Sequence, residues 1–235
     1  MSKKTGNISK SATNAEIDAF IQKVALTPAS APTGERGRLI FALDATASRE
    51  PTWDRACQIQ GHMFQEASSV GGLDIQMAYY RGFGEFRASE WLTDSGQLVR
   101  QMTKVFCLGG QTQIAKILKH AIAEGNARKV NALVFVGDCM EESVDELCQL
   151  AGELGILGVP TFIFQEGDEP IATQAFKQIA RLTGGAHCSF DSSSADQLRD
   201  LLSAVAVFSA GGRKALESFS KRAGRDVLLI AQQVK

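Results

Sequence analysis

A carboxylate and two hydroxyls at alternate positions form the most suggestive short pattern in this sequence. Asp44, Thr46 and Ser48 follow directly after a short apolar run. In an extended or turning backbone alternate residues point the same way, so the three oxygens could converge on one point. Hard oxygen ligands that carry little charge suit Mg²⁺, which keeps several waters and leaves positions for an incoming ligand. The pattern therefore predicts a magnesium site.

Two residues farther along the chain could complete such a site. Asp138 comes shortly after the apolar run Val130–Val136, and Thr112 stands where a helix is expected to begin. Parallel α/β sheets bind ligands at the carboxyl ends of their strands, so side chains placed there meet at one edge. We therefore expect five side chains to converge around one point: Asp44, Thr46, Ser48, Thr112 and Asp138.

Strands and helices alternate along the chain, as a mostly parallel sheet requires. Apolar runs predict strands buried on both faces at residues 39–43, 130–136 and 159–165. Further strands are expected at residues 73–79, 85–92 (a short edge strand paired with the one before it) and 186–190. Helices are expected at residues 15–25, 53–70, 141–154, 171–182, 194–210 and 214–222, with one more beginning at Asp94 or Ser95 and another ending at Gly125.

The expected fold is a doubly wound, Rossmann-like α/β domain. It consists of a mostly parallel sheet that has one antiparallel edge strand and is flanked by helices. Residues 38–210 make up this domain. Residues 1–37 are expected to be a partly disordered N-terminal extension, because residues 1–14 are rich in Ser, Thr, Lys and Asn. Residues 211–235 are expected to form a C-terminal helix and tail that pack on the domain or extend from it.

The residues and their order resemble a von Willebrand factor A domain with a metal-ion-dependent adhesion site, and look closest to its bacterial intracellular members. That family has Asp-x-Ser-x-Ser after the first strand, a Thr in a later loop and an Asp after the fourth strand. The resemblance covers roughly residues 38–210. This chain departs from the pattern in four places: Thr46 replaces the first Ser, Asp138 follows Gly rather than Thr, Cys139 stands where Gly is common, and Gln111 separates Thr112 from the Gly pair.

The resemblance implies a metal-dependent protein-binding module without catalytic activity of its own. Thr46, Ser48 and often Thr112 would contact Mg²⁺ or Mn²⁺ directly, and Asp44 and Asp138 would bind it directly or through water. A partner protein would supply an Asp or Glu to the remaining position of the metal. Intracellular relatives often serve as adaptors in larger assemblies, including those of AAA+ ATPases.

The same residues are compatible with other functions. A Mg²⁺-dependent phosphoryl hydrolase of the haloacid dehalogenase type also places a carboxylate after a buried strand, but Thr46 stands where that family has its second Asp. The chain could also be a structural subunit with a vestigial metal site. In the plainest interpretation, Asp44 and Asp138 are turn residues or helix caps. The sequence contains neither a P-loop nor a Gly-x-Ser-x-Gly motif.

Composition narrows the class of protein further. The 235 residues are 44% apolar and 22% charged, which is typical of a globular chain with a sizeable core. A net charge of −1 gives no bulk attraction to nucleic acid or to an anionic membrane. No apolar run approaches the ~20 residues of a membrane span, and the polar start is not a secretory signal. Five cysteines without a C-x-x-C motif favour reduced thiols, so we expect a cytoplasmic protein.

Charge is distributed unevenly along the chain. Residues 130–176 contain no Lys or Arg and nine acidic residues, whereas basic residues predominate from Arg199 onward. The acidic stretch is either a solvated face or a surface that selects a partner with basic residues around its carboxylate.

Overall fold

The computed structural model describes residues 36–50, 72–190 and 202–210, together with the single positions 19, 23 and 215. The helix expected at residues 53–70, the C-terminal tail and most of both extensions lie outside these residues. Within the described part, no helix is long and apolar enough to cross a membrane.

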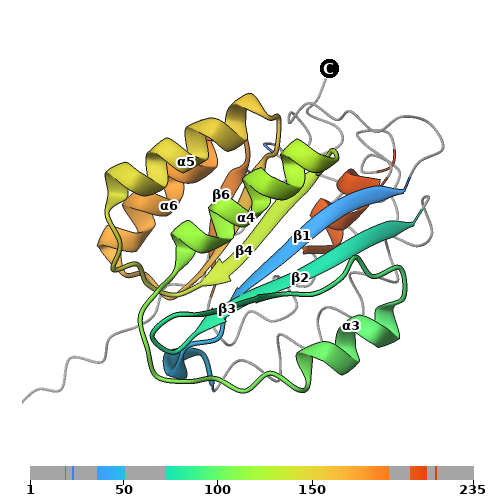
Figure 1. Cartoon of the computed structure of the whole chain (residues 1–235). Coiled ribbons are helices and arrows are strands. Elements are labelled where there is room, and N and C mark those ends of the chain that lie inside the picture. The colour runs from blue at the N-terminus through green and yellow to red at the C-terminus, as the bar shows by residue number, and fades with distance from the viewer. Residues whose placement is uncertain are drawn as a thin grey trace, which may run out of the picture.

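A six-stranded sheet forms the centre of the domain (Figure 1). The strands are β1 (Gly37–Asp44), β2 (Leu73–Arg81), β3 (Glu85–Ala88), β4 (Ala132–Gly137), β5 (Thr161–Glu166) and β6 (Ala186–Phe190). Their order in the sheet is β3-β2-β1-β4-β5-β6. All neighbours are parallel except β2 and β3, which pair antiparallel at the edge. The doubly wound α/β fold expected from the sequence is confirmed.

Helices cover both faces of the sheet, and every residue of β1 is therefore buried. The described helices are α3 (Ser95–Met102), α4 (Ile114–Ala127), α5 (Val144–Ile156) and α6 (Pro170–Leu182), and residues 202–210 are also helical. Leu39, Phe41 and Leu43 of β1 belong to the core on the side of α3 and residues 202–210. Ile40 and Ala42 belong to the core beneath α4, α5 and α6, which Figure 1 shows stacked together.

Element boundaries differ from expectation at several points. The strand β3 ends at Ala88, and Leu92 forms only an isolated bridge with Ile75. The helix α4 continues past Gly125 to Ala127, since Gly125 does not adopt the positive φ of a glycine that ends a helix. The helix α5 begins at Val144, so the acidic residues just before it are available for contacts elsewhere.

The strand order creates one position where the direction of winding reverses. The chain moves outward from β1 to β2 and β3, then returns to the other side of β1 and continues outward through β4, β5 and β6. In doubly wound sheets the crevice at such a switch point, outside the carboxyl ends of the strands, is the usual ligand site. Here it lies between the ends of β1 and β4.

Candidate metal site at the carboxyl edge of the sheet

The two predicted carboxylates lie at this switch point. Asp44 is the last residue of β1, and Asp138 directly follows β4. The two strands are parallel neighbours, with Leu43 level with Val136. A Cβ atom built on Gly137 would lie 3.5 Å from the Cβ of Asp44, so the strand ends approach closely.

Asp44 is fully buried and is held by two hydrogen bonds. Its Oδ1 accepts from the Thr46 backbone N–H at 2.8 Å, and its Oδ2 accepts from the Tyr80 hydroxyl at 2.8 Å. Burial raises the pKa of Asp44, and Asp138 adds to that rise, whereas the bonds from Thr46 and Tyr80 oppose it. The carboxylate is therefore fixed in orientation, and each oxygen keeps a lone pair for a further ligand.

The two hydroxyls that follow Asp44 lie side by side. Residues Ala47–Arg49 form a turn of 3₁₀ helix, in which the Arg49 N–H donates to the Thr46 carbonyl at 3.0 Å. This turn brings the Thr46 Oγ1 within 3.1 Å of the Ser48 Oγ. Thr46 is buried and Ser48 is exposed, so the pair runs from the interior to the surface.

Thr112 is fixed to the loop that follows β4 by a reciprocal pair of hydrogen bonds. The Thr112 N–H donates to the Glu141 carboxylate at 3.1 Å, and the Glu141 N–H donates to the Thr112 Oγ1 at 3.0 Å. Glu142 accepts from the first two N–H groups of α4, those of Ile114 and Ala115, at 2.7 and 2.8 Å. These bonds keep the start of α4 next to the segment that carries Asp138.

Asp138 has an unusual environment for a carboxylate. Its Oδ1 is buried, and it has no hydrogen-bond partner among the described residues. Burial together with the charges of Asp138 and Asp44 raises the pKa of the neighbouring Cys139 thiol to about 12. Such a thiol stays protonated at neutral pH, so it is a poor nucleophile.

These side chains could hold a hard divalent ion only if carboxylate and hydroxyl oxygens both bind it. Within the described residues, no three His, Cys, Asp or Glu side chains gather in a way that could hold a metal. Hydroxyl oxygens would therefore have to supply part of any coordination shell, as Mg²⁺ accepts together with water. The buried, unsatisfied Asp138 Oδ1 is the atom that such an ion would satisfy.

Two residues near the site, Tyr80 and Arg49, are not identified by the sequence analysis. Tyr80 stands level with Asp44 in the register of β1 and β2, but nothing in its own segment marks it as a partner. Arg49 is only 1% exposed and forms an ion pair with Glu166 at the end of β5. An arginine directly after a polar turn normally predicts a solvated side chain, so its burial has no signal in the sequence.

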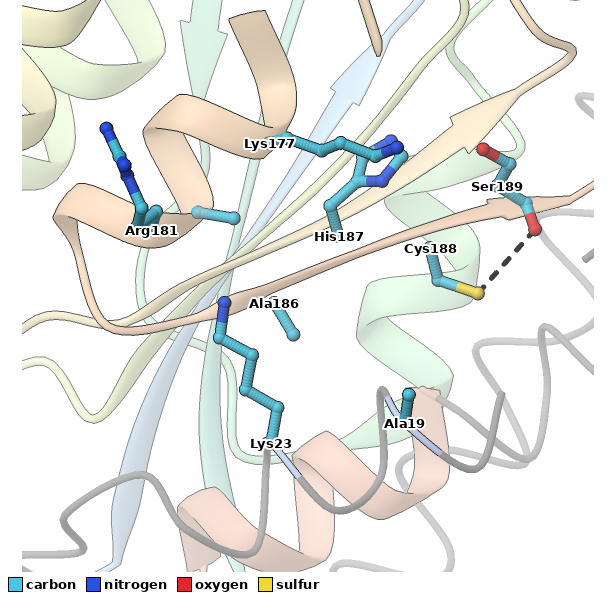
Figure 2. A pocket seen from close by; sticks show the side chains of 9 residues that line it. Ala19, Lys23, Lys177, Arg181, Ala186, His187, Cys188 and Ser189 are labelled. Carbon is cyan, nitrogen blue, oxygen red and sulfur yellow. Dashed lines mark hydrogen bonds between the residues drawn. The ribbon is translucent and has the colours of Figure 1, made fainter. Parts of the chain in front are cut away.

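A separate hollow lies against β6 and α6, with a volume of about 400 Å³ (Figure 2). Its described lining comprises Ala19, Lys23, Lys177, Ala180, Arg181, Ala186, His187, Cys188 and Ser189. Figure 2 shows His187 on one side of β6 and Ala186 and Cys188 on the other, as the alternation of a strand requires. The His187 Nε2 makes a hydrogen bond with the Gln165 side chain at 2.9 Å. This hollow shares no residue with the candidate metal site.

Comparison of the sequence with protein-family models and with curated proteins finds no match. Solved structures do match the fold. A von Willebrand factor type A protein from Catenulispora acidiphila is 13% identical with a TM-score of 0.59, over 74% of this chain and 43% of that one. The SpRpn10 VWA domain is 16% identical with a TM-score of 0.58, over 72% of this chain and 94% of that one. Manganese-loaded TRAP from Plasmodium vivax is 14% identical with a TM-score of 0.53, over 72% and 74%.

This chain therefore spans less than half the length of the Catenulispora protein, and its likeness to all three is one of fold. The chain has the von Willebrand factor A fold, as the order of its strands and helices predicts.

Proposed function

We propose that this chain is a metal-dependent protein-interaction module. In this proposal, the carboxyl edge of the sheet between β1 and β4 binds Mg²⁺ or Mn²⁺, and the metal receives a carboxylate from a partner protein. The observation that carries the proposal is the buried Asp138 Oδ1, which has no hydrogen-bond partner among the described residues and stands beside Asp44 at the switch point of the sheet. A buried carboxylate oxygen without a partner is costly unless a ligand satisfies it.

Each residue of the site has a role in this proposal. Thr46, Ser48 and Thr112 offer hydroxyl oxygens to the metal, and Asp44 and Asp138 bind it directly or through water. The metal supplies a Lewis-acidic position that attracts an anionic oxygen. The bonds from Tyr80 and the Thr46 N–H hold Asp44 in place before any ligand arrives, which lowers the cost of ordering the site.

The proposed partner is a protein that presents an Asp or Glu, rather than a nucleic acid or a membrane. The net charge of −1 gives no bulk attraction to nucleic acid or to an anionic membrane, and the acidic residues that follow β4 favour a partner with basic residues around that carboxylate. We further propose, from the resemblance of the sequence motif to intracellular members of the von Willebrand factor A family, that the module works in the cytoplasm as an adaptor within a larger assembly, such as that of an AAA+ ATPase.

A non-catalytic role agrees with the chemistry of the edge. The alternative of a Mg²⁺-dependent phosphoryl hydrolase needs a second carboxylate as general acid and base where Thr46 stands. The Thr46 hydroxyl instead lies 3.1 Å from the Ser48 hydroxyl, and a threonine hydroxyl does not serve as the general acid and base of that reaction. The neighbouring thiol of Cys139, with its pKa of about 12, does not replace the missing acid-base pair.

Affinity capture with and without metal tests the proposal. The chain is immobilised and exposed to lysate of its native cell in Mg²⁺ and in EDTA, and each retained protein is then purified and titrated by calorimetry. The variant Asp138→Ala should abolish metal-dependent binding, because it removes the unsatisfied oxygen. Asp145→Ala, a matched change at an exposed position on α5, should leave binding intact.

The result decides between the alternatives. Binding of a purified partner with equal affinity in Mg²⁺ and in EDTA would refute the metal-bridged mechanism and favour the vestigial site. Hydrolysis of p-nitrophenyl phosphate that depends on Mg²⁺ and disappears in Asp44→Asn would favour the phosphoryl hydrolase.

A further inference from the structure

A buried arginine crosses the proposed metal site. Arg49 belongs to the turn that follows β1, and its guanidinium pairs with Glu166, the last residue of β5. The strand β4 lies between β1 and β5 in the sheet. The Arg49 side chain must therefore pass over the carboxyl end of β4, where Asp138 stands.

The register of the strands supports this path. Gly137 of β4 is level with Gln165 of β5, so the residues that follow them, Asp138 and Glu166, are placed side by side at the same edge. Burial lowers the pKa of Arg49, and the charges of Asp138 and Asp44 oppose that effect by favouring the charged guanidinium. The guanidinium, in a side chain that is only 1% exposed, thus pairs with Glu166 and also lies within the electrostatic influence of two further carboxylates.

We infer that Arg49 is the built-in counter-ion of this edge and that it competes with the divalent metal for the carboxylates. The inference rests on the proposed function and adds a regulatory element to it. A buried guanidinium close to carboxylates offsets their mutual repulsion when no metal is bound. The same positive charge repels an incoming Mg²⁺ or Mn²⁺ across a region of low dielectric. The site is therefore stable without metal and binds metal weakly until a partner's carboxylate joins it.

Replacing Arg49 should shift metal affinity and stability in opposite directions. Arg49→Met keeps a long apolar stem and removes the charge. Its Mn²⁺ affinity should rise about tenfold or more, a change of about 1.4 kcal/mol per factor of ten. In EDTA the same variant should melt at a lower temperature than the wild type, because its carboxylates lack a counter-ion. Mn²⁺ should raise its melting temperature more than that of the wild type.

Two further variants separate charge from packing. Arg49→Lys keeps the positive charge and should bind Mn²⁺ nearly as weakly as the wild type. Arg38→Met removes a second buried arginine, which pairs with Glu124 at 3.0 Å and sits at the opposite, amino-terminal end of β1. That variant should also lose stability, but its Mn²⁺ affinity should match the wild type.

Glu166→Gln gives a test that does not require removal of the arginine. Without the Glu166 charge, the guanidinium should interact more strongly with Asp138 and Asp44. Mn²⁺ should therefore bind to these two carboxylates more weakly than in the wild type. This variant keeps the experiment decisive if Arg49→Met fails to fold.

Calorimetry with Mn²⁺ alone and thermal melts in EDTA, on the full chain, measure both effects. Equal Mn²⁺ affinity in the wild type and Arg49→Met, with equal melting temperatures in EDTA, would overturn the inference and leave the proposed function standing. Undetectable Mn²⁺ binding in both proteins would overturn the competition and, with it, the metal dependence of the proposed function.

Discussion

The carboxylate of Glu142 is expected to carry an unusually large share of the stability of α4. The residue before this helix, Gln113, makes no capping bond with its side chain. Glu142 supplies the cap from 28 residues away, accepting from the Ile114 N–H at 2.7 Å and from the Ala115 N–H at 2.8 Å. A negative charge at a helix N-terminus also interacts favourably with the helix dipole.

The size of the effect follows from these two bonds. A hydrogen bond to a charged group contributes about 1.5–3 kcal/mol when it is buried, and loss of a local N-cap costs about 1 kcal/mol. Because Glu142 is only half-buried, water can replace part of each bond. We therefore expect Glu142→Ala to lower the free energy of unfolding by about 2 kcal/mol. Glu142→Gln keeps one acceptor oxygen without the charge, and should cost about 1 kcal/mol.

Urea unfolding followed by circular dichroism measures these values. The control is Glu146→Ala, which removes an exposed acidic residue from the first turn of α5 together with its exposed ion pair to Lys119, and which should cost well under about 1 kcal/mol. If Glu142→Ala unfolds like the wild type, the capping role is wrong. An equal loss in Glu142→Ala and Glu142→Gln would show that the charge, rather than the two bonds, stabilises the helix.

Two further predictions concern other parts of the fold. Burial lowers the pKa of His120 from 6.5, although the charge of Glu124 opposes this, so the folded state binds fewer protons than the unfolded state. The free energy of unfolding should therefore fall as the pH drops below about 6.5. Urea unfolding at about pH 7.5 and 5.5 should show a smaller fall for His120→Gln than for the wild type. A parallel fall in both proteins would contradict this. A Cβ on Gly110 would lie 2.0 Å from the Gly82 carbonyl oxygen, so Gly110→Ala should lower the free energy of unfolding by about 2 kcal/mol or more. Gly109 has open space around it, so Gly109→Ala should cost far less in the same urea unfolding experiment. Similar losses of stability in the two variants would show that the loop adapts.

The amino-acid sequence by itself determines the main strands and the edge at which the candidate site lies. Continuous apolar runs mark β1, β4 and β5, because a strand between two layers of helices must be apolar on both faces. The polar residues Asp44 and Asp138 follow two of these runs, and parallel strands place their carboxyl ends together. These features are local or follow from general rules of α/β topology, so a single sequence suffices to predict them.

Only the tertiary structure decides how the charges around that edge are paired. The sequence pattern places Glu142 in the first turn of the following helix, but in the fold it caps α4. Nothing in the sequence marks Arg49 as a buried residue, yet it lies buried and reaches Glu166 two strands away. The physical reason is the same in both cases. A charged side chain pairs with whichever partner the strand order and the loops bring near it. The pattern of apolar and polar residues along the chain does not predict which residue that partner is.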